Sequence, residues 1–470
     1  MSLIASYILP HPPIVIDKIG KENIVRCKKT KSALKRVAKE IMNLNPDSII
    51  VITPHGTVFS DAVTINYADV LYGNLEKFGY KEIELKKENE MSLVEEIFLK
   101  SKLEGISIAK LDNKLINRFN ISNEIDHGII VPLYYIDEIY KKYRLVHINY
   151  GGLSYYEHYK FGIAIRKACE NIDNKVVLIA SGDLSHKLSD EGPYSYSPFG
   201  VEFDNSIVKY LKGKDNRGII NMDLQLCNAA GECGKRSIDT LLGTLDGYSY
   251  DSELISYEGP FGVGYAVVSF NNFIKDKKKK IYDLLIKDKL LKHKKRLSDE
   301  DIYVKLARET IEYYVVNRKK IDINSLDLPV EMFTKRAGVF VSIKNHSGLR
   351  GCIGTTGMGV EKNIANEIVR NAIEASMHDP RFDEIEEHEL NDLIISVDIL
   401  EKSERINDLK ELDTKKYGII VESGYKRGLL LPNLDGINTV EKQLDIVLKK
   451  AGISKNEDYT VERFIVTRHY

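Results

Sequence analysis

The sequence has little of what marks a secreted or membrane-bound protein. Its five cysteines are scattered and include no C-x-x-C pair, which is typical of free thiols in a reducing compartment and argues against a disulfide scaffold or a zinc ribbon. The N-terminus has no basic segment, its apolar run is too short for a secretion signal, and no later run approaches the length of a membrane span. We therefore expect a cytoplasmic protein.

An excess of either charge is also missing. The 68 Lys and Arg residues nearly balance the 69 Asp and Glu residues, which leaves a net charge of -1. This balance predicts that the protein binds neither nucleic acid nor a membrane surface, and it favours a small molecule or another protein as partner. The sequence leaves the oligomeric state open and allows a homo-oligomer. At 470 residues the chain exceeds the size of one hydrophobic core, so we expect two or three domains.

The first part of the chain, residues 1–271, alternates apolar runs with amphipathic stretches. This alternation predicts an α/β domain with a central sheet flanked by helices. The clearest strand candidates are 4–9, 48–53, 144–148, 175–180 and 264–270. The clearest helix candidates are 26–44, 156–171 and 234–245.

A lysine-rich segment at 272–297 indicates a solvated, partly helical linker to a second domain at 298–470. Ser298 is expected to cap the first helix of that domain, because acidic residues follow it in the first turn. Strands at 337–343, 393–400 and 417–421 and helices at 302–316, 360–376 and 440–451 make this domain α+β.

Three histidines follow directly on predicted strands of the first domain. His11 lies between prolines after the first strand, His55 follows Pro54 after the second, and His186 follows the strand at 175–180 by a few residues. Open α/β sheets bind ligands beyond the carboxyl ends of their strands. A single histidine is more often structural, but the shared position of these three favours a metal site with His11 and His55 as ligands.

Two histidines leave such a site incomplete, and a carboxylate would complete the facial triad that holds Fe(II). Glu232 is the first choice, and Glu258, ahead of the last strand, is the weaker candidate. Glu232 could instead stabilise the start of the helix that follows it. Cys233 beside it is the alternative ligand, and a thiolate would shift the preference toward zinc or copper.

The remaining polar groups suggest roles in proton transfer and substrate contact. His186 could act as a general base and acid, since an imidazole titrates near neutral pH. Asp183 could orient His186, and His127 could contact substrate. A buried structural role for His127 is nearly as well supported.

These motifs together resemble the class III (LigB-type) extradiol ring-cleavage dioxygenases and, equally, the related Memo proteins. The matching segments are the His11 loop, Thr53-Pro54-His55, Ser181-Gly182-Asp183-Leu184-Ser185-His186 and Gly231-Glu232-Cys233-Gly234. The resemblance implies Fe(II) on His11, His55 and Glu232, with His186 as acid and base, acting on a catechol-like diol and O2. Memo-like proteins have a cysteine in place of the glutamate, and here both residues are present.

The second domain is similar to the AMMECR family through Leu349-Arg350-Gly351-Cys352-Ile353-Gly354, followed by Asp379-Pro380-Arg381-Phe382. Arg350 and Cys352, flanked by glycines, could form a loop that a ligand approaches closely. A structural turn with a buried thiol explains the motif equally well. The fusion of both domains resembles the AmmeMemoRadiSam grouping, which implies a radical SAM protein as partner.

Two functions from different classes follow from these residues. The leading one is a non-haem Fe(II)-dependent ring-cleavage dioxygenase. The alternative is a Memo-like metal-binding or protein-interaction protein that works with a radical SAM partner and cleaves no ring. A metal-dependent hydrolase ranks last.

Overall fold

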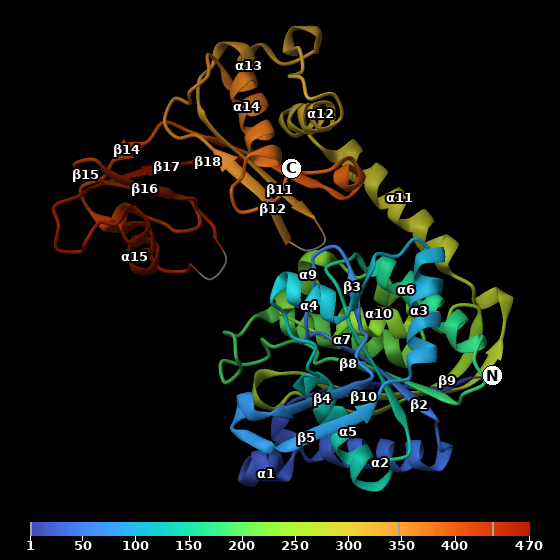
Figure 1. Ribbon diagram of the computed structural model, residues 1–470. Helices are drawn as coiled ribbons and strands as arrows, with labels where there is room; N and C mark the ends of the chain where they lie inside the picture. The colour runs from blue at the N-terminus through green and yellow to red at the C-terminus, as the bar shows by residue number, and fades with distance from the viewer. Residues whose placement is uncertain (1, 346–347, 435–436) are drawn as a thin grey trace. The chain divides into compact units, whose positions relative to one another are not determined.

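The computed structural model describes residues 2–345, 348–434 and 437–470. The chain divides into two compact units, one ending at Leu290 and the other running from Leu291 to Tyr470 (Figure 1). Each unit has its own hydrophobic clusters, and each is described separately below.

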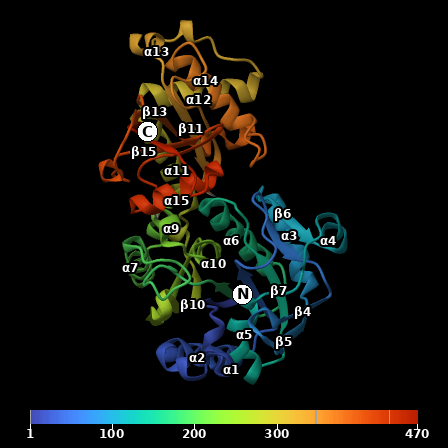
Figure 2. The same ribbon diagram turned by 90° about the vertical axis from the view of Figure 1, so that its left-hand side faces the viewer.

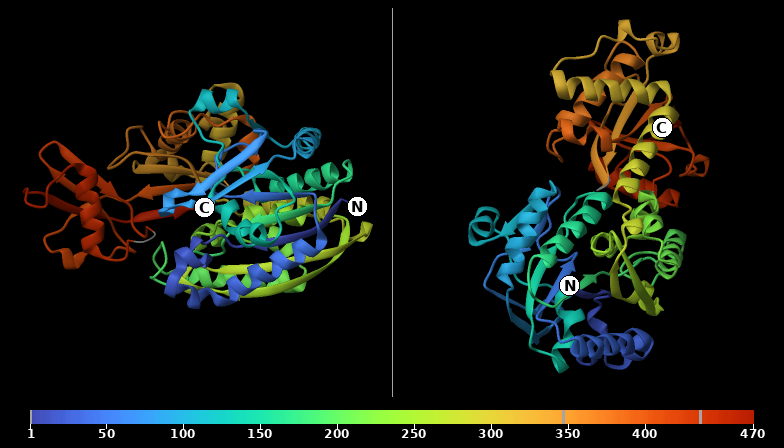
Figure 3. Two further views of the ribbon diagram at one scale, coloured as in Figure 1. Left: turned by 60° about the horizontal axis from the view of Figure 1, so that its bottom comes forward. Right: turned by 90° about the vertical axis from the view of Figure 1, so that its right-hand side faces the viewer.

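An eight-stranded sheet forms the centre of the first unit. In spatial order its strands are β6 (Ile108–Leu111), β3 (Val63–Asn66), β7 (Arg144–Asn149), β2 (Ser48–Thr53), β8 (Val176–Ser181), β1 (Leu3–Leu9), β10 (Tyr265–Lys275) and β9 (Tyr248–Glu258). The neighbouring pairs β7–β2, β2–β8 and β8–β1 are parallel, whereas β1, β10 and β9 pair antiparallel. The hairpin of β9 and β10 forms one edge of the sheet (Figure 3).

Both faces of this sheet are covered, because every residue of β2 and β8 is buried. Successive residues point to opposite faces, so Ile50 and Ile52 join one hydrophobic cluster and Ile49 and Val51 the other. One face packs on α2 (Lys28–Leu44) and α5 (His127–Ile139). The other packs on α3 (Met91–Leu103), α6 (Tyr155–Glu170), α7 (Pro198–Gly213) and α10 (Lys235–Gly243). The result is a three-layer α/β unit (Figure 2).

Smaller elements complete the first unit. They are α1 (Asp17–Gly20), α4 (Asn113–Phe119), α8 (Asn216–Ile220), α9 (Leu224–Ala230) and a hairpin of β4 (Val70–Leu75) and β5 (Tyr80–Glu88). The hairpin turn is a short 3-10 helix, Glu76–Phe78, closed by Gly79 at a φ of 84°. A residue with a side chain would be strained at that angle, so glycine suits the position.

The parallel strands explain why the predicted motifs converge. β2, β8 and β1 lie side by side and run in the same direction, so their carboxyl ends meet at one edge of the sheet. His11, His55 and the segment 181–186 follow these three ends. The sheet topology therefore brings together residues that lie far apart in sequence.

The segment that was expected to be a linker is mostly regular structure. β10 continues to Lys275, and α11 (Tyr282–Asp299) begins a few residues later. The prediction that Ser298 caps a helix is wrong, because Ser298 lies in the last turn of α11 and its hydroxyl donates to the carbonyl of Lys295. Asp301 caps α12 (Ile302–Asn317) instead, and its carboxylate accepts from the first backbone N–H groups of that helix.

The second unit contains two four-stranded antiparallel sheets. The first orders β12 (Gly348–Gly354), β11 (Gly338–Asn345), β13 (Ile394–Leu400) and β18 (Val466–His469), and it packs on α12 and α14 (Ile364–Met377). The second orders β14 (Glu404–Arg405), β17 (Thr460–Phe464), β15 (Gly418–Ser423) and β16 (Lys426–Leu430), and it packs on α15 (Val440–Ala451). A short helix, α13 (Val330–Thr334), completes the unit. The α+β prediction is confirmed.

Within the described residues, no helix combines the length and apolar character needed to cross a membrane.

Candidate metal centre

His11 is the most enclosed of the histidines at the sheet edge, with only 2% of its surface exposed. Its Nδ1 lies 2.9 Å from the hydroxyl of Ser181, and that hydroxyl donates its own hydrogen to the carbonyl of Gly128. The Ser181 oxygen must therefore accept the hydrogen of His11 Nδ1. This assigns the tautomer of His11 and leaves the lone pair on Nε2, which is the form that binds a metal.

Asp183 also contacts His11. One carboxylate oxygen accepts from the backbone N–H of His11 at 3.0 Å, and the other lies 3.9 Å from His11 Nε2. The sequence suggested that Asp183 orients His186, but the structure places the carboxylate against His11. Asp183 thus fixes the loop that carries the most buried imidazole.

His55 and His127 lie on the open side of His11. His55 is exposed, and its Nε2 is 2.9 Å from His11 Nε2. The ring of His127 stacks on His55 with centroids 4.3 Å apart. Asp126 holds both histidines in place, because its carboxylate caps α5 at the N–H of Gly128 and accepts from the hydroxyl of Thr53 at the end of β2.

Cys233 reaches this group through a close backbone contact. A Cβ on Gly182 would lie 2.1 Å from the Cα of Gly234, so only glycine allows the two loops to touch. The contact brings the Cys233 sulfur within 3.6 Å of His11 Nε2 and 3.8 Å of His186 Nε2. His11, His55 and Cys233 together offer one donor atom each, all within 4.8 Å of one another.

These separations fit a metal ion. Bond lengths of about 2.0–2.1 Å to nitrogen and about 2.3 Å to sulfur place two nitrogen ligands roughly 3.3 Å apart in a tetrahedral site, and a nitrogen and a sulfur roughly 3.5 Å apart. The corresponding distances here are 2.9 Å between the histidine nitrogens and 3.6 Å between His11 and the sulfur. Changes of a few tenths of an ångström would bring these two separations to the values expected around one ion.

Glu232, the first choice for the third ligand, is not part of this group. Its carboxylate accepts from the backbone N–H of Lys235 at 2.6 Å, at the start of α10. That position stabilises the helix N-terminus, which is the alternative role that the sequence predicted for Glu232. Glu258 is similarly occupied, because it accepts from the backbone and hydroxyl of Thr30.

Burial sets the charge state of the group. It lowers the pKa of His11 well below its usual value, and the pKa values of His127 and His186 fall to about 4. His55 is exposed at the surface, but neighbouring groups partly desolvate its ring and lower its pKa as well. All four imidazoles are therefore neutral at pH 7 and have lone pairs to offer. Burial raises the pKa of the Cys233 thiol well above its usual value, so a metal that binds there must displace a proton.

His186 completes the cluster at its Cys233 side. Its neutral ring can accept a proton at pH 7, as predicted for a general base, and Tyr194 stacks beside it with ring centroids 6.1 Å apart. The ring of Phe78 lies against that of His127, with centroids 5.0 Å apart. Sequence reasoning assigned no role to Ser181, Phe78 or Tyr194, because no motif marks a residue whose importance comes only from its neighbours.

The predicted site in the second unit has mainly structural contacts. Arg350 forms a two-pronged ion pair with Glu389 and donates to the carbonyls of 383 and 384. The backbone N–H of Cys352 is bound by Asp379, and its sulfur lies 3.3 Å from the hydroxyl of Ser342. Arg350 therefore holds the loop at 383–389, and Cys352 remains partly exposed.

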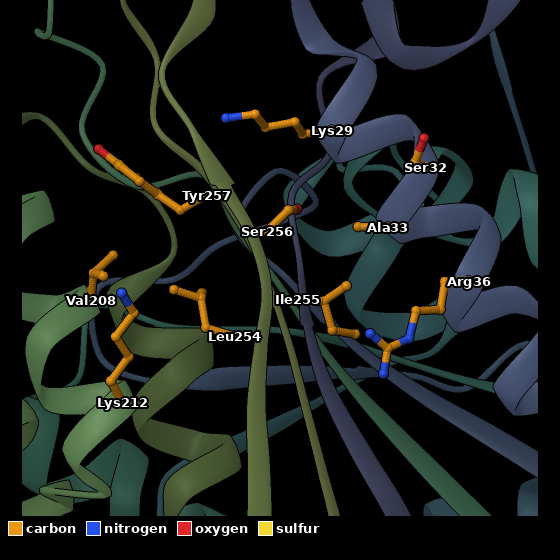
Figure 4. A pocket seen from close by; sticks show the side chains of 10 residues that line it. All are labelled: Lys29, Ser32, Ala33, Arg36, Val208, Lys212, Leu254, Ile255, Ser256 and Tyr257. Atoms are coloured by element: carbon orange, nitrogen blue, oxygen red, sulfur yellow. The ribbon is translucent and has the colours of Figure 1, made fainter.

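A separate cavity of about 610 Å³ lies over the edge strand β9, between α2 and α7 (Figure 4). Leu254 and Ile255 line it together with Lys29, Arg36 and Lys212. Two oxygens of Glu253 bind the Arg36 guanidinium at 2.6 and 2.7 Å, so its charge is already compensated. None of the histidines of the sheet edge lines this cavity.

Two family models match the chain. The catalytic LigB subunit of aromatic ring-opening dioxygenase matches residues 5–268, and AMMECR1 matches residues 304–469. The chain belongs to the LigB family. The first match covers more than half of the chain and includes every histidine of the candidate metal centre, and the second covers most of the second unit.

Similar proteins are found in several microorganisms. Protein CA_C1420 of Clostridium acetobutylicum is 43% identical over the whole chain and 99% of its own length. A protein of Thermotoga maritima is 46% identical over 36% of this chain and 98% of its own. Among solved structures, the uncharacterized protein JW3007 from Escherichia coli K12 has a TM-score of 0.40 and 15% identity, covering 57% of this chain and 99% of that one.

Proposed function

We propose that the first unit is a metal-dependent oxidoreductase whose metal ion is bound by His11, His55 and Cys233. The observation that carries this proposal is the convergence of one donor atom from each residue within 4.8 Å. The tautomer assigned to His11 and the neutral state of His55 support it, because both leave lone pairs for a cation. Fe(II) is our first choice of metal, given the family, and zinc or copper would suit the thiolate equally well.

Three protein ligands leave coordination positions open for a substrate. His55 is exposed, whereas His11 and Cys233 are buried, so a substrate would approach from the His55 side. A bound metal would supply Lewis-acid and redox chemistry at that position. His186, which is neutral at pH 7, would take a proton from a substrate hydroxyl and later return it.

We propose a catechol-like diol and O2 as the substrates, following the family match to ring-opening dioxygenases. In that reaction one carbon–carbon bond of the ring breaks and both oxygen atoms of O2 enter the product. Carbon is oxidised, O2 is reduced and no further reductant is consumed. His127, close to His55 and accessible from the same side, would contact the bound diol.

Metal analysis of two variants tests the ligand set. Full-length protein loaded anaerobically with Fe(II) or zinc should retain one ion per chain in the wild type and in Glu232→Ala, and lose most of it in Cys233→Ser. Glu232→Ala is the matched control for Cys233→Ser, because residues 232 and 233 are adjacent. Loss of metal in Glu232→Ala alone would contradict the Cys233 assignment.

Oxygen uptake tests the reaction. The Fe(II)-loaded protein should consume O2 in the presence of a suitable catechol, and His186→Ala should reduce the rate by about a hundredfold or more while it retains its metal. A loaded protein that takes up no O2 with any of a broad panel of catechols would contradict ring cleavage.

Cys233 also favours a second candidate function, a Memo-like metal-binding protein that cleaves no ring. In that case the AMMECR1 domain would recruit a partner, and we propose a radical SAM protein for this role. The chain itself has no C-x-x-x-C-x-x-C run that would bind an iron–sulfur cluster. Pull-down of a radical SAM protein by the full chain, lost when residues 298–470 are removed, would support this alternative over ring cleavage if O2 uptake is absent.

A further inference from the structure

Two exposed aromatic rings lie beside the histidines of the metal centre. Phe78 is 42% exposed and its ring centroid is 5.0 Å from that of His127. Tyr194 is 55% exposed and its ring stacks on His186, with an interplanar angle of 25°. The two rings come from segments far apart in sequence, and each touches a different histidine.

The local structure does not require an aromatic residue at either position. At the tip of the β4–β5 hairpin, the turn is closed by Gly79 rather than by the side chain of Phe78. The loop that contains Tyr194 is held by other bonds: the backbone N–H of Leu188 donates to Gly262, and that of Tyr196 donates to Asp190. The position of both rings against histidines of the site is therefore the feature that calls for an explanation.

The inner side of the site is closed, and flat rings lie on its open side. His11 and Asp183 fill the inner side, and both are less than a tenth exposed. His127 stacks on the exposed His55, with ring centroids 4.3 Å apart, and Phe78 lies against His127. A ligand that enters beside His55 therefore passes flat side chains, which stack well on a planar ring.

We propose that Phe78 and Tyr194 bind the aromatic ring of the substrate, so that the site selects planar aromatic ligands over other metal-binding molecules. This inference rests on the proposed metal centre at His11, His55 and Cys233. It adds two specificity residues, neither of which is a metal ligand or donates a proton.

Full-length protein loaded anaerobically with cobalt(II) allows the binding of two probes to be compared by visible absorbance. 4-Nitrocatechol is aromatic, and azide is a small metal ligand without a ring. Phe78→Ala and Tyr194→Ala should each weaken 4-nitrocatechol binding about three- to tenfold, because an aromatic contact is lost. Azide binding should stay within twofold of the wild type, and Tyr194→Phe, which keeps the ring, should bind 4-nitrocatechol like the wild type.

Tyr72→Ala is the matched control, because Tyr72 is an exposed aromatic residue on the same hairpin and bonds to Glu84. It should leave both probes unaffected. Unchanged 4-nitrocatechol binding in both alanine variants would overturn the proposal, as would equal weakening of azide. Wild-type protein that holds cobalt but binds no 4-nitrocatechol would overturn it too, whereas wild-type protein that fails to hold cobalt would contradict the metal centre itself.

Discussion

The hydroxyl of Ser181 determines which nitrogen of His11 faces the metal centre. It lies 2.9 Å from His11 Nδ1 and donates its hydrogen to the Gly128 carbonyl, so it can only accept from the imidazole. Ser181 is the last residue of β8, and His11 follows the neighbouring strand β1. The pairing of two parallel strands thus sets the tautomer of a proposed metal ligand.

Ser181→Ala should therefore weaken metal binding although Ser181 is not a ligand. Without the hydroxyl, the His11 ring can rotate and adopt the other tautomer. We expect a loss of about 10- to 100-fold in metal affinity, as is usual for partners of metal-binding histidines. Competition with a chelator measures it. Ser6→Ala removes a buried β1 hydroxyl that has no hydrogen-bond partner, and it should leave the affinity unchanged.

Metal affinity should rise with pH because of Cys233. Burial raises the pKa of its thiol, so each ion bound at neutral pH displaces a proton. The pKa of Asp183 is raised to about 7, and Asp183→Asn removes any further proton from that group. In this background, the logarithm of the affinity should rise by about one per pH unit between roughly pH 5.5 and 8.

The histidines add little to this slope, because the pKa values of His127 and His186 lie at about 4 and those of His11 and His55 are also lowered. Adding Cys233→Ser should make the residual affinity nearly independent of pH over the same range. A slope that persists without the thiol would mean that another group loses the proton.

Asp204 should make the free energy of unfolding depend on pH. Burial raises its pKa to about 7 in the folded protein, although Tyr257 and the Ser185 backbone donate to it. An unfolded aspartate has a pKa of about 3.9, so the unfolded state loses its proton first as pH rises. The protonated group contributes at most about 4 kcal/mol to the free energy of unfolding. This contribution is complete below about pH 4 and is lost as the pH rises through about 7.

Denaturant unfolding at pH 4.5 and 7.5 measures this contribution. Asp204→Asn should reduce the difference in unfolding free energy between the two pH values, because an amide does not titrate. Asp251→Asn, at a mostly exposed carboxylate, should not. An identical pH difference in wild type and Asp204→Asn would show that the aspartate is ionised in the fold.

Gly351 in the second unit should be intolerant of a side chain. A Cβ there would lie 2.0 Å from the carbonyl oxygen of Ala375, because β12 packs directly on α14. Gly351→Ala should lower the melting temperature of this unit by several degrees, in line with a cost of about 1–3 kcal/mol for overpacking. Cys352→Ala, next to it and partly exposed, should have a much smaller effect. Equal effects would contradict a packing role for the glycine.

The sheet and its histidines were predictable because the central strands are continuous apolar runs. The run at 48–53 coincides with β2, and the runs before His11 and His186 end within a residue of β1 and β8. Parallel strands that are buried on both faces leave this pattern in the sequence. Within the segment from β3 to β6, the short strands β3 and β6 were missed, because they are fixed by pairing with each other and with the distant strand β7.

The sequence could not decide between Glu232 and Cys233, because the two residues are neighbours in one loop. Which side chain faces the histidines depends on the contact between Gly182 and Gly234, and the chain separates these glycines by an entire helical region. The prediction of the residue that caps α12 was wrong for a similar reason. Ser298 has the right type, but α11 continues past it, so Asp301 takes that position.

X-ray absorption at the metal edge tests the central claim most directly. Full-length protein loaded with zinc should show one sulfur at about 2.3 Å and nitrogen or oxygen atoms at about 2.0–2.1 Å. Cys233→Ser should lose the sulfur, and Glu232→Ala should keep it. A wild-type spectrum with nitrogen and oxygen neighbours alone would contradict a metal centre built on His11, His55 and Cys233.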